Sequence, residues 1–180
     1  MSKFKGKKKL STTIHNSIKR NVGINTAVRF GVEFESFYLD NKISYSLIFA
    51  KPADKYFKEF FENCLGFIFE SDNDDFDIFT LSLLHEIGHI KTMKKFTQKQ
   101  IDKDFEKKDE ISEWSMEAKR THFVYFALPT EIAASRWAVN WAEKHPKKYK
   151  ALKEDIRQSV FEFYKTNNLE TDNSVFNSPN

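Results

Sequence analysis

Hydrophobic and polar residues alternate in the first third of the chain, and this pattern predicts strands. A strand is expected over residues 28–39, because apolar residues occupy every second position from Val28 to Phe34, a period of two typical of a strand with one buried face. Asp40 and Asn41 follow as a tight-turn pair, because both residue types tolerate the left-handed backbone that short hairpins need. A returning strand is expected over residues 43–49 and a third strand over residues 66–70. We therefore expect a small, mostly antiparallel sheet of about three strands.

The rest of the chain has helical patterns. Helices are expected over residues 52–64, 76–95, 97–120, 129–144 and 146–165. Three of them begin at or next to a proline, a residue that suits the first turn of a helix. Two consecutive strands, then one helix and a third short strand, and then helices alone, predict an α+β fold.

Length and composition indicate one globular domain. A chain of 180 residues with 19 Phe, 6 Tyr and 3 Trp can bury a substantial core and is short for two domains. We expect the domain over residues 21–166, between a basic flexible arm at residues 1–20 and a polar disordered tail at residues 167–180. The single cysteine, Cys64, excludes an intramolecular disulfide and favours a reducing compartment. No apolar run is long enough for a transmembrane helix or a secretory signal, so we expect a cytoplasmic protein.

The lysine-rich arm at residues 1–20 has two interpretations, and residues 11–19 within it are a candidate for a short helix. The arm is either a solvated tail or a segment that binds nucleic acid or an acidic partner. A net charge of +3 does not by itself indicate a nucleic-acid partner, and the arm has no aromatic residue besides Phe4. These observations favour the solvated tail.

The strongest candidate for chemistry is the motif His85-Glu86-Ile87-Gly88-His89. On a helix, residues four apart lie on the same face, so His85 and His89 can direct two imidazole nitrogens at one Zn²⁺ ion. Glu86 lies beside that face, where its carboxylate can take a proton from a zinc-bound water. The alternative is a buried helix whose histidines form hydrogen bonds in the core.

Gly88 favours the metal site over a plain core helix. Glycine inside a helix costs about 0.5–1 kcal/mol relative to alanine, so the missing side chain should bring a compensating gain. Close approach of a neighbouring strand or helix beside the metal would supply that gain.

A catalytic zinc site needs a third protein ligand. The extended motif with a third histidine is absent, since Lys95 occupies that position. Glu131 is the favoured candidate: it lies between apolar segments at the start of a helix, and a carboxylate there is costly to bury unless it is paired or metal-bound. Ala134, one turn later, is small enough for the two helices to approach closely. His122 is the competing ligand.

Other residues near Glu131 could assist catalysis. A hydrolytic site needs a group that stabilises negative charge on the substrate oxygen. Tyr125, His122 and Arg136 are close enough in sequence to serve, and the sequence does not choose among them.

The order of hairpin, third strand, His-Glu-x-x-His helix and Glu-x-x-Ala on a later helix resembles the gluzincin metallopeptidases. The chain is most similar to the compact ImmA/IrrE-type peptidases and related phage or mobile-element proteins, through residues 85–89 and 131–134. The resemblance implies a zincin-like domain whose sheet packs on the active-site helix and the glutamate helix. It also implies Zn²⁺ held by His85, His89 and Glu131, with Glu86 as general base, in a bacterial or phage-infected cell.

We therefore expect a zinc metallopeptidase that hydrolyses a protein or peptide substrate. The alternative is a catalytically inactive binding or structural protein that keeps the same scaffold. An open coordination position separates the two, because a fourth protein ligand such as His122 would close the site. The oligomeric state does not follow from the sequence.

Overall fold

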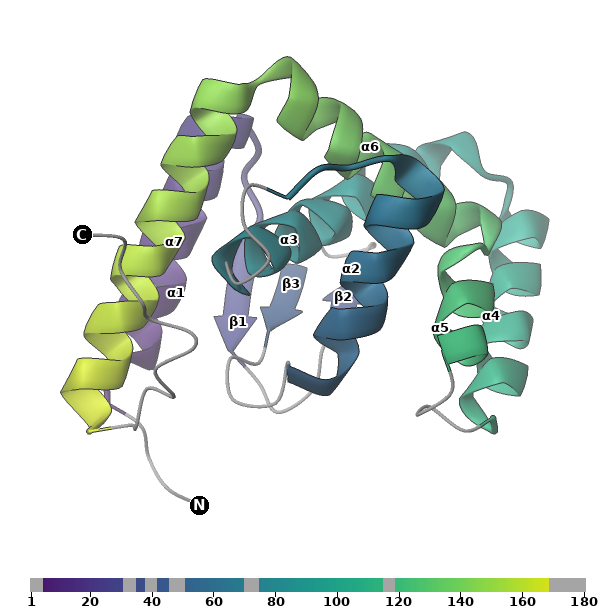
Figure 1. Cartoon of the computed structure of the whole chain (residues 1–180), viewed down its shortest axis with the longest axis horizontal. Helices are drawn as coiled ribbons and strands as arrows, with labels where there is room; N and C mark the ends of the chain where they lie inside the picture. Colours follow the sequence, from purple (N-terminus) through teal and green to yellow (C-terminus); the bar gives the residue numbers. More distant parts are fainter. Residues whose placement is uncertain are drawn as a thin grey trace. The chain divides into compact units, whose positions relative to one another are not determined.

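Seven α-helices make up most of the described chain (Figure 1). In this computed structural model the described residues are 5–30, 35–37, 42–45, 51–69, 75–114 and 119–168. The helices are α1 (Lys7–Val22), α2 (Lys51–Leu65), α3 (Asp75–Thr92), α4 (Gln98–Ser112), α5 (Lys119–Phe126), α6 (Pro129–Lys144) and α7 (Pro146–Asn167), with a 3-10 turn, η1, at Met93–Lys95. None of these described helices combines the length and apolar character needed to cross a bilayer.

The strands are few and short. In the described residues they are β1 (Ala27–Phe30), β2 (Glu35–Phe37) and β3 (Lys42–Tyr45). β3 pairs antiparallel with β2, as in a hairpin, and parallel with β1. The predicted α+β, zincin-like fold built on a mostly antiparallel sheet is therefore wrong, because the chain is a helical protein. The period-two pattern marked extended backbone correctly in the described parts of residues 28–49; the rest of that range, with Asp40 and Asn41, lies outside the described residues.

The third strand expected over residues 66–70 is also wrong. Residues 66–69 have no regular secondary structure, and residue 70 lies outside the described part. The alternation that suggested a strand is real, since Phe67 and Phe69 are buried while Ile68 is 87% exposed. Alternating burial alone does not make a strand, which also needs a neighbour to pair with.

The chain divides into two compact units. The first contains residues 1–47, 69–80 and 145–180, and the second contains residues 48–68 and 81–144. The strands, α1 and α7 belong to the first unit, and α2, α4, α5 and α6 belong to the second with most of α3. The single domain expected over residues 21–166 stays a prediction.

In the first unit, α1 lies beside α7 (Figure 1). Leu10, Ile14 and Ile18 recur at every fourth position of α1 and are buried, as expected for the apolar face of an amphipathic helix. The flexible arm expected over residues 1–20 is therefore wrong from Lys7 onward. The short helix considered at residues 11–19 is confirmed and is longer than expected, and every fourth residue forms its buried face.

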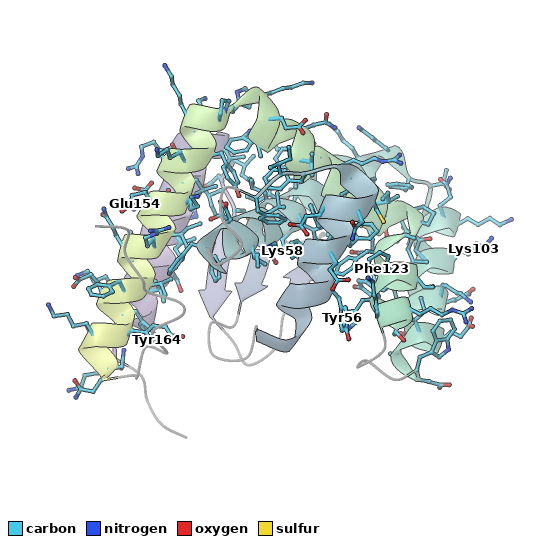
Figure 2. The ribbon with its side chains drawn as sticks, viewed as in Figure 1. Tyr56, Lys58, Lys103, Phe123, Glu154 and Tyr164 are labelled. Atoms are coloured by element: carbon cyan, nitrogen blue, oxygen red, sulfur yellow. The ribbon has the colours of Figure 1, made fainter. Side chains whose placement is uncertain are left out.

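The second unit has an aromatic core formed by α2 and α5. Rings of Phe57 and Phe60 on α2 pack against Phe126 on α5, with centroids 5.5 and 5.2 Å apart. Phe60 also packs on Phe123, 5.7 Å away; Figure 2 labels Phe123 and, on the facing helix, Tyr56. Such pairs add about 0.5–1.5 kcal/mol each beyond burial. This aromatic core holds α2 and α5 together, and its rings Phe57 and Phe126 also contact the ring of His85 on α3.

Candidate metal centre

His85 and His89 lie one turn apart on α3, as the motif predicts. Their side chains are buried, with 3% and 2% exposure, and their Nε2 atoms are 3.1 Å apart. The surrounding residues Leu81, Leu84 and Ile87 are fully buried, so α3 has apolar contacts on several faces and its orientation is set by packing. Both imidazoles thus present the same ring nitrogen to one point.

Glu131 completes the group from the first turn of α6. Its Oε2 atom lies 3.1 Å from Nε2 of His85 and 3.2 Å from Nε2 of His89. The start of α6 is fixed by a hydrogen bond from the backbone N–H of Thr130 to Oδ2 of Asp104 on α4, 2.8 Å long. The preceding Pro129 is preorganised for a helix start. This anchoring places a carboxylate that is only 1% exposed against both histidines.

The three atoms form a nearly equilateral triangle suited to a metal ion. A tetrahedral ion bound at about 2.0–2.1 Å separates its ligand atoms by about 3.3 Å, close to the 3.1, 3.1 and 3.2 Å observed. Two imidazole nitrogens and one carboxylate oxygen can each direct a lone pair at the centre of such a triangle. The buried group of His85, His89 and Glu131 is therefore close enough to bind a metal ion.

Ser135 fixes the orientation of the His85 ring. Its Oγ lies 3.0 Å from Nδ1 of His85, and Ser135 follows Glu131 by one helical turn on α6. When the Nε2 atom of His85 directs its lone pair at a metal ion, Nδ1 carries the ring proton and donates a hydrogen bond to the Oγ atom of Ser135. Hydrogen-bond partners of this kind determine the tautomer and the ring orientation of a metal-binding histidine. Ser135 was not predicted from the sequence, although its spacing from Glu131 places it on the same face of α6.

Gly88 allows α3 and α6 to approach closely, as expected from the sequence. A Cβ atom at Gly88 would lie 2.9 Å from Cα and the carbonyl carbon of Ala134, and still closer to its carbonyl oxygen. Ala134 and Ala138 are fully buried small residues on α6. Any larger side chain at position 88 would push the helix that carries Glu131 away from the histidines.

Replacing Gly88 with alanine is expected to lower the free energy of unfolding by about 1–3 kcal/mol, the usual cost of overpacking a core. The clash is with backbone atoms of Ala134, so it cannot be relieved by a side-chain rotation. Chemical denaturation of both proteins measures the change. Ser82→Ala on the same helix is the control, because it alters helix propensity without adding volume; an equally stable Gly88→Ala protein would contradict the close approach.

Glu86 is a buried carboxylate next to the ligand group. It is 5% exposed, and its Oε2 atom has no hydrogen-bond partner among the described residues. Its negative charge contributes to raising the pKa of both His85 and Tyr125. A buried carboxylate oxygen without a partner is costly, so this position favours a role in chemistry over one in stability.

The charges of the group are mutually dependent. Burial alone would raise the pKa of Glu131, but the charge of His89 and hydrogen bonds from both histidines hold that pKa well below its usual range. Burial likewise opposes protonation of His85, yet the hydrogen bond and charge of Glu131 raise the pKa of His85 overall. Glu131 therefore stays ionised and attracts positive charge.

The two tentative catalytic residues lie in different settings. Burial, followed by the charges of Glu131 and Glu86, raises the pKa of Tyr125, so its hydroxyl remains a proton donor. His122 instead stacks on Tyr56, with ring centroids 4.8 Å apart, and is not part of the ligand group. The structure thus relates Tyr125 electrostatically to the candidate centre and does not make His122 a ligand. Arg136 is exposed on α6.

Lys108 on α4 is a neighbour of the centre that the sequence analysis missed. Its Nζ atom lies 2.5 Å from Oε1 of Glu131, and its side chain is only 14% exposed. The sequence predicted only a charged, mostly helical segment over residues 97–120. A usable pattern was present, because Lys108 lies on the same helical face as Ile101, Asp104 and Ile111, of which the last two are buried.

Comparisons with family models, with curated proteins and with solved structures find no match for this chain. The resemblance to gluzincin metallopeptidases is therefore supported by no relative. What the geometry shows is a helical protein with a buried His85, His89 and Glu131 group able to hold a metal ion.

Proposed function

We propose that this chain is a zinc-dependent hydrolase that cleaves a peptide bond in a protein or peptide substrate. The observation that carries the proposal is Glu86, whose buried Oε2 atom lacks a hydrogen-bond partner in the described residues beside a three-ligand group. A metal site that only stabilises the fold has no need of a costly unpartnered carboxylate. A hydrolytic site needs such a group as its general base.

The ligand set supports zinc with an open coordination position. Structural zinc sites are usually closed by four protein ligands, whereas catalytic sites have three and leave the fourth position for water or substrate. In the described residues no fourth His, Cys, Asp or Glu side chain joins the group. Two histidines and a carboxylate also suit non-haem Fe(II), but Glu86 favours hydrolysis because an oxygenase site has no need of a general base there.

The residues of the chain divide the reaction between them. A zinc ion held by His85, His89 and Glu131 would lower the pKa of a bound water to about 7 and polarise the substrate carbonyl. Glu86 takes the proton of the attacking water and later delivers it to the leaving amine. The hydroxyl of Tyr125 donates a hydrogen bond to the carbonyl oxygen as negative charge develops there. The first test concerns the metal, on which these roles depend.

Elemental analysis after reconstitution with zinc is expected to give about one zinc per chain. His85→Ala and Glu131→Ala should each retain almost none, because each removes one corner of the ligand triangle. His145→Ala is the matched control, since this histidine is exposed on the other compact unit. A wild-type protein that takes up no zinc would overturn the proposal. Zinc retained by Glu131→Ala alone would show that the third ligand is another residue.

A further inference from the structure

We propose that Lys108 is a positioning residue that keeps Glu131 bound to the metal through one oxygen only. The inference rests on the proposed function, because it assigns a role toward the metal held by the same group. It concerns a residue that the ligand triangle and the general base leave unused.

The two oxygens of Glu131 have different partners. Oε2 faces the Nε2 atoms of His85 and His89 at 3.1 and 3.2 Å. Oε1 faces Nζ of Lys108 at 2.5 Å, a charge-assisted contact. A carboxylate can bind a metal through one oxygen or through both, and the contact with Lys108 occupies the second oxygen. Glu131 is thereby directed toward one-oxygen binding.

The surroundings of Lys108 hold its ammonium group in this place. Nζ lies 5.2 Å from the ring centroid of Phe105 on α4 and 5.5 Å from that of Tyr125 on α5. Cation–π contacts of this length attract a lysine to both rings. Together with the low exposure of the side chain, they limit the alternative positions that a solvent-exposed lysine would have. The ammonium is therefore available to Oε1 as a fixed partner.

Loss of the Lys108 charge would free Oε1. A buried carboxylate oxygen without a partner seeks the nearest cation, since leaving it unpaired is costly. The nearest remaining cation would be the metal, so Glu131 would bind through both oxygens. The added ligand atom would fill the position that a water or substrate needs. In this way Lys108 preserves the open position without touching the metal.

Cobalt(II) reports coordination number directly, because four-coordinate cobalt absorbs visible light much more strongly than five- or six-coordinate cobalt. The experiment compares Co²⁺-loaded wild type with Lys108→Met, Lys108→Arg and Lys103→Met. The methionine variant removes the positive charge with a side chain of similar length, and the arginine variant keeps the charge. Lys103 lies on the same helix, is exposed, and points away from the neighbouring helices (Figure 2), so its variant controls for loss of any surface lysine.

Wild type, Lys108→Arg and Lys103→Met are expected to show the intense spectrum of four-coordinate cobalt. Lys108→Met should bind one equivalent of cobalt with a spectrum several-fold weaker. An unchanged spectrum in Lys108→Met would overturn the inference and leave Lys108 as a structural link between α4 and α6. If Lys108→Met does not fold, Lys108→Leu takes its place with the same expectation, because its apolar side chain brings neither a cation nor a hydrogen-bond donor to Oε1.

The failure of this inference can be distinguished from failure of the proposed function. A wild type that takes up no cobalt or zinc contradicts the metal site itself. Normal uptake by wild type with identical spectra in all variants contradicts only the role of Lys108. Neither result depends on knowing the substrate.

Discussion

Replacing Glu86 with glutamine is expected to lower the rate of peptide hydrolysis by about 10²–10⁴-fold, the usual contribution of a general acid–base group. Glutamine has nearly the same shape but cannot accept the proton of the attacking water. Since Glu86 is not among the three ligand residues, zinc content should remain about one per chain. The two results together separate a catalytic carboxylate from a metal ligand.

Cleavage is measured by mass spectrometry on a peptide library, with wild type and Glu86→Gln at equal zinc occupancy. Glu143→Gln is the matched control, because Glu143 is exposed on α6. Undiminished cleavage by Glu86→Gln would refute the role of Glu86. Full zinc occupancy without cleavage by the wild type would favour the alternative, a metal-binding protein without turnover.

The same substitution has a second, opposite consequence for stability. Glu86 has a buried oxygen without a hydrogen-bond partner in the described part of the chain, and a neutral amide is less costly to bury than a carboxylate. The metal-free Glu86→Gln protein should therefore be more stable by about 1 kcal/mol. Lower activity together with higher stability is typical when a residue that serves function at the expense of stability is replaced. If Glu86 were purely structural, the substitution would lower stability instead.

Zinc binding is expected to stabilise the fold strongly. Free zinc at about 100 times the dissociation constant raises the free energy of unfolding by about 2.7 kcal/mol, if the unfolded chain does not bind it. For a chain of this size, such a gain raises Tm by roughly 5–11 °C. The physical reason is that the ligands come from α3 and α6, so the ion joins two helices that separate on unfolding.

Differential scanning calorimetry with and without zinc measures this shift. His89→Ala should show almost no shift, because it removes one corner of the triangle. His15→Ala is a control that alters a histidine of α1 outside the group. Magnesium, which prefers oxygen ligands, should shift Tm much less than zinc. Equal shifts in the wild type and His89→Ala would place the stabilising ion elsewhere.

The candidate site was more predictable than the fold. A spacing of four residues on a helix determines that His85 and His89 share a face, whatever the rest of the chain does. Gly88 and Ala134 were identified because a helix interior penalises glycine and rewards close packing, and the structure confirms that approach. The proximity of Glu131 was likewise correctly inferred from the cost of burying its carboxylate.

The missed features depend on contacts between distant segments. Lys108 meets Glu131 across 23 positions of sequence; its helical face could be read from Asp104 and Ile111, but the partner on α6 could not. Residues 66–69 alternate in burial without pairing, because a strand needs a neighbour that local pattern does not supply. The N-terminal helix extends beyond the short helix considered at residues 11–19; the lysines obscured its full length, although Leu10, Ile14 and Ile18 have the spacing of a buried helical face.

The burial of the ligand group has a consequence for exchange kinetics. His85, His89 and Glu131 are each exposed by 3% or less and lie on two packed helices, so an ion at their centre would lose its three protein ligands only when α3 and α6 separate, although its fourth position stays open to water. Release should therefore proceed at the rate of that separation, however much competing chelator surrounds the protein. A metal acquired during folding would then exchange slowly. Occupancy would reflect which ion was available while the chain folded, more than the later competition among metals in its surroundings.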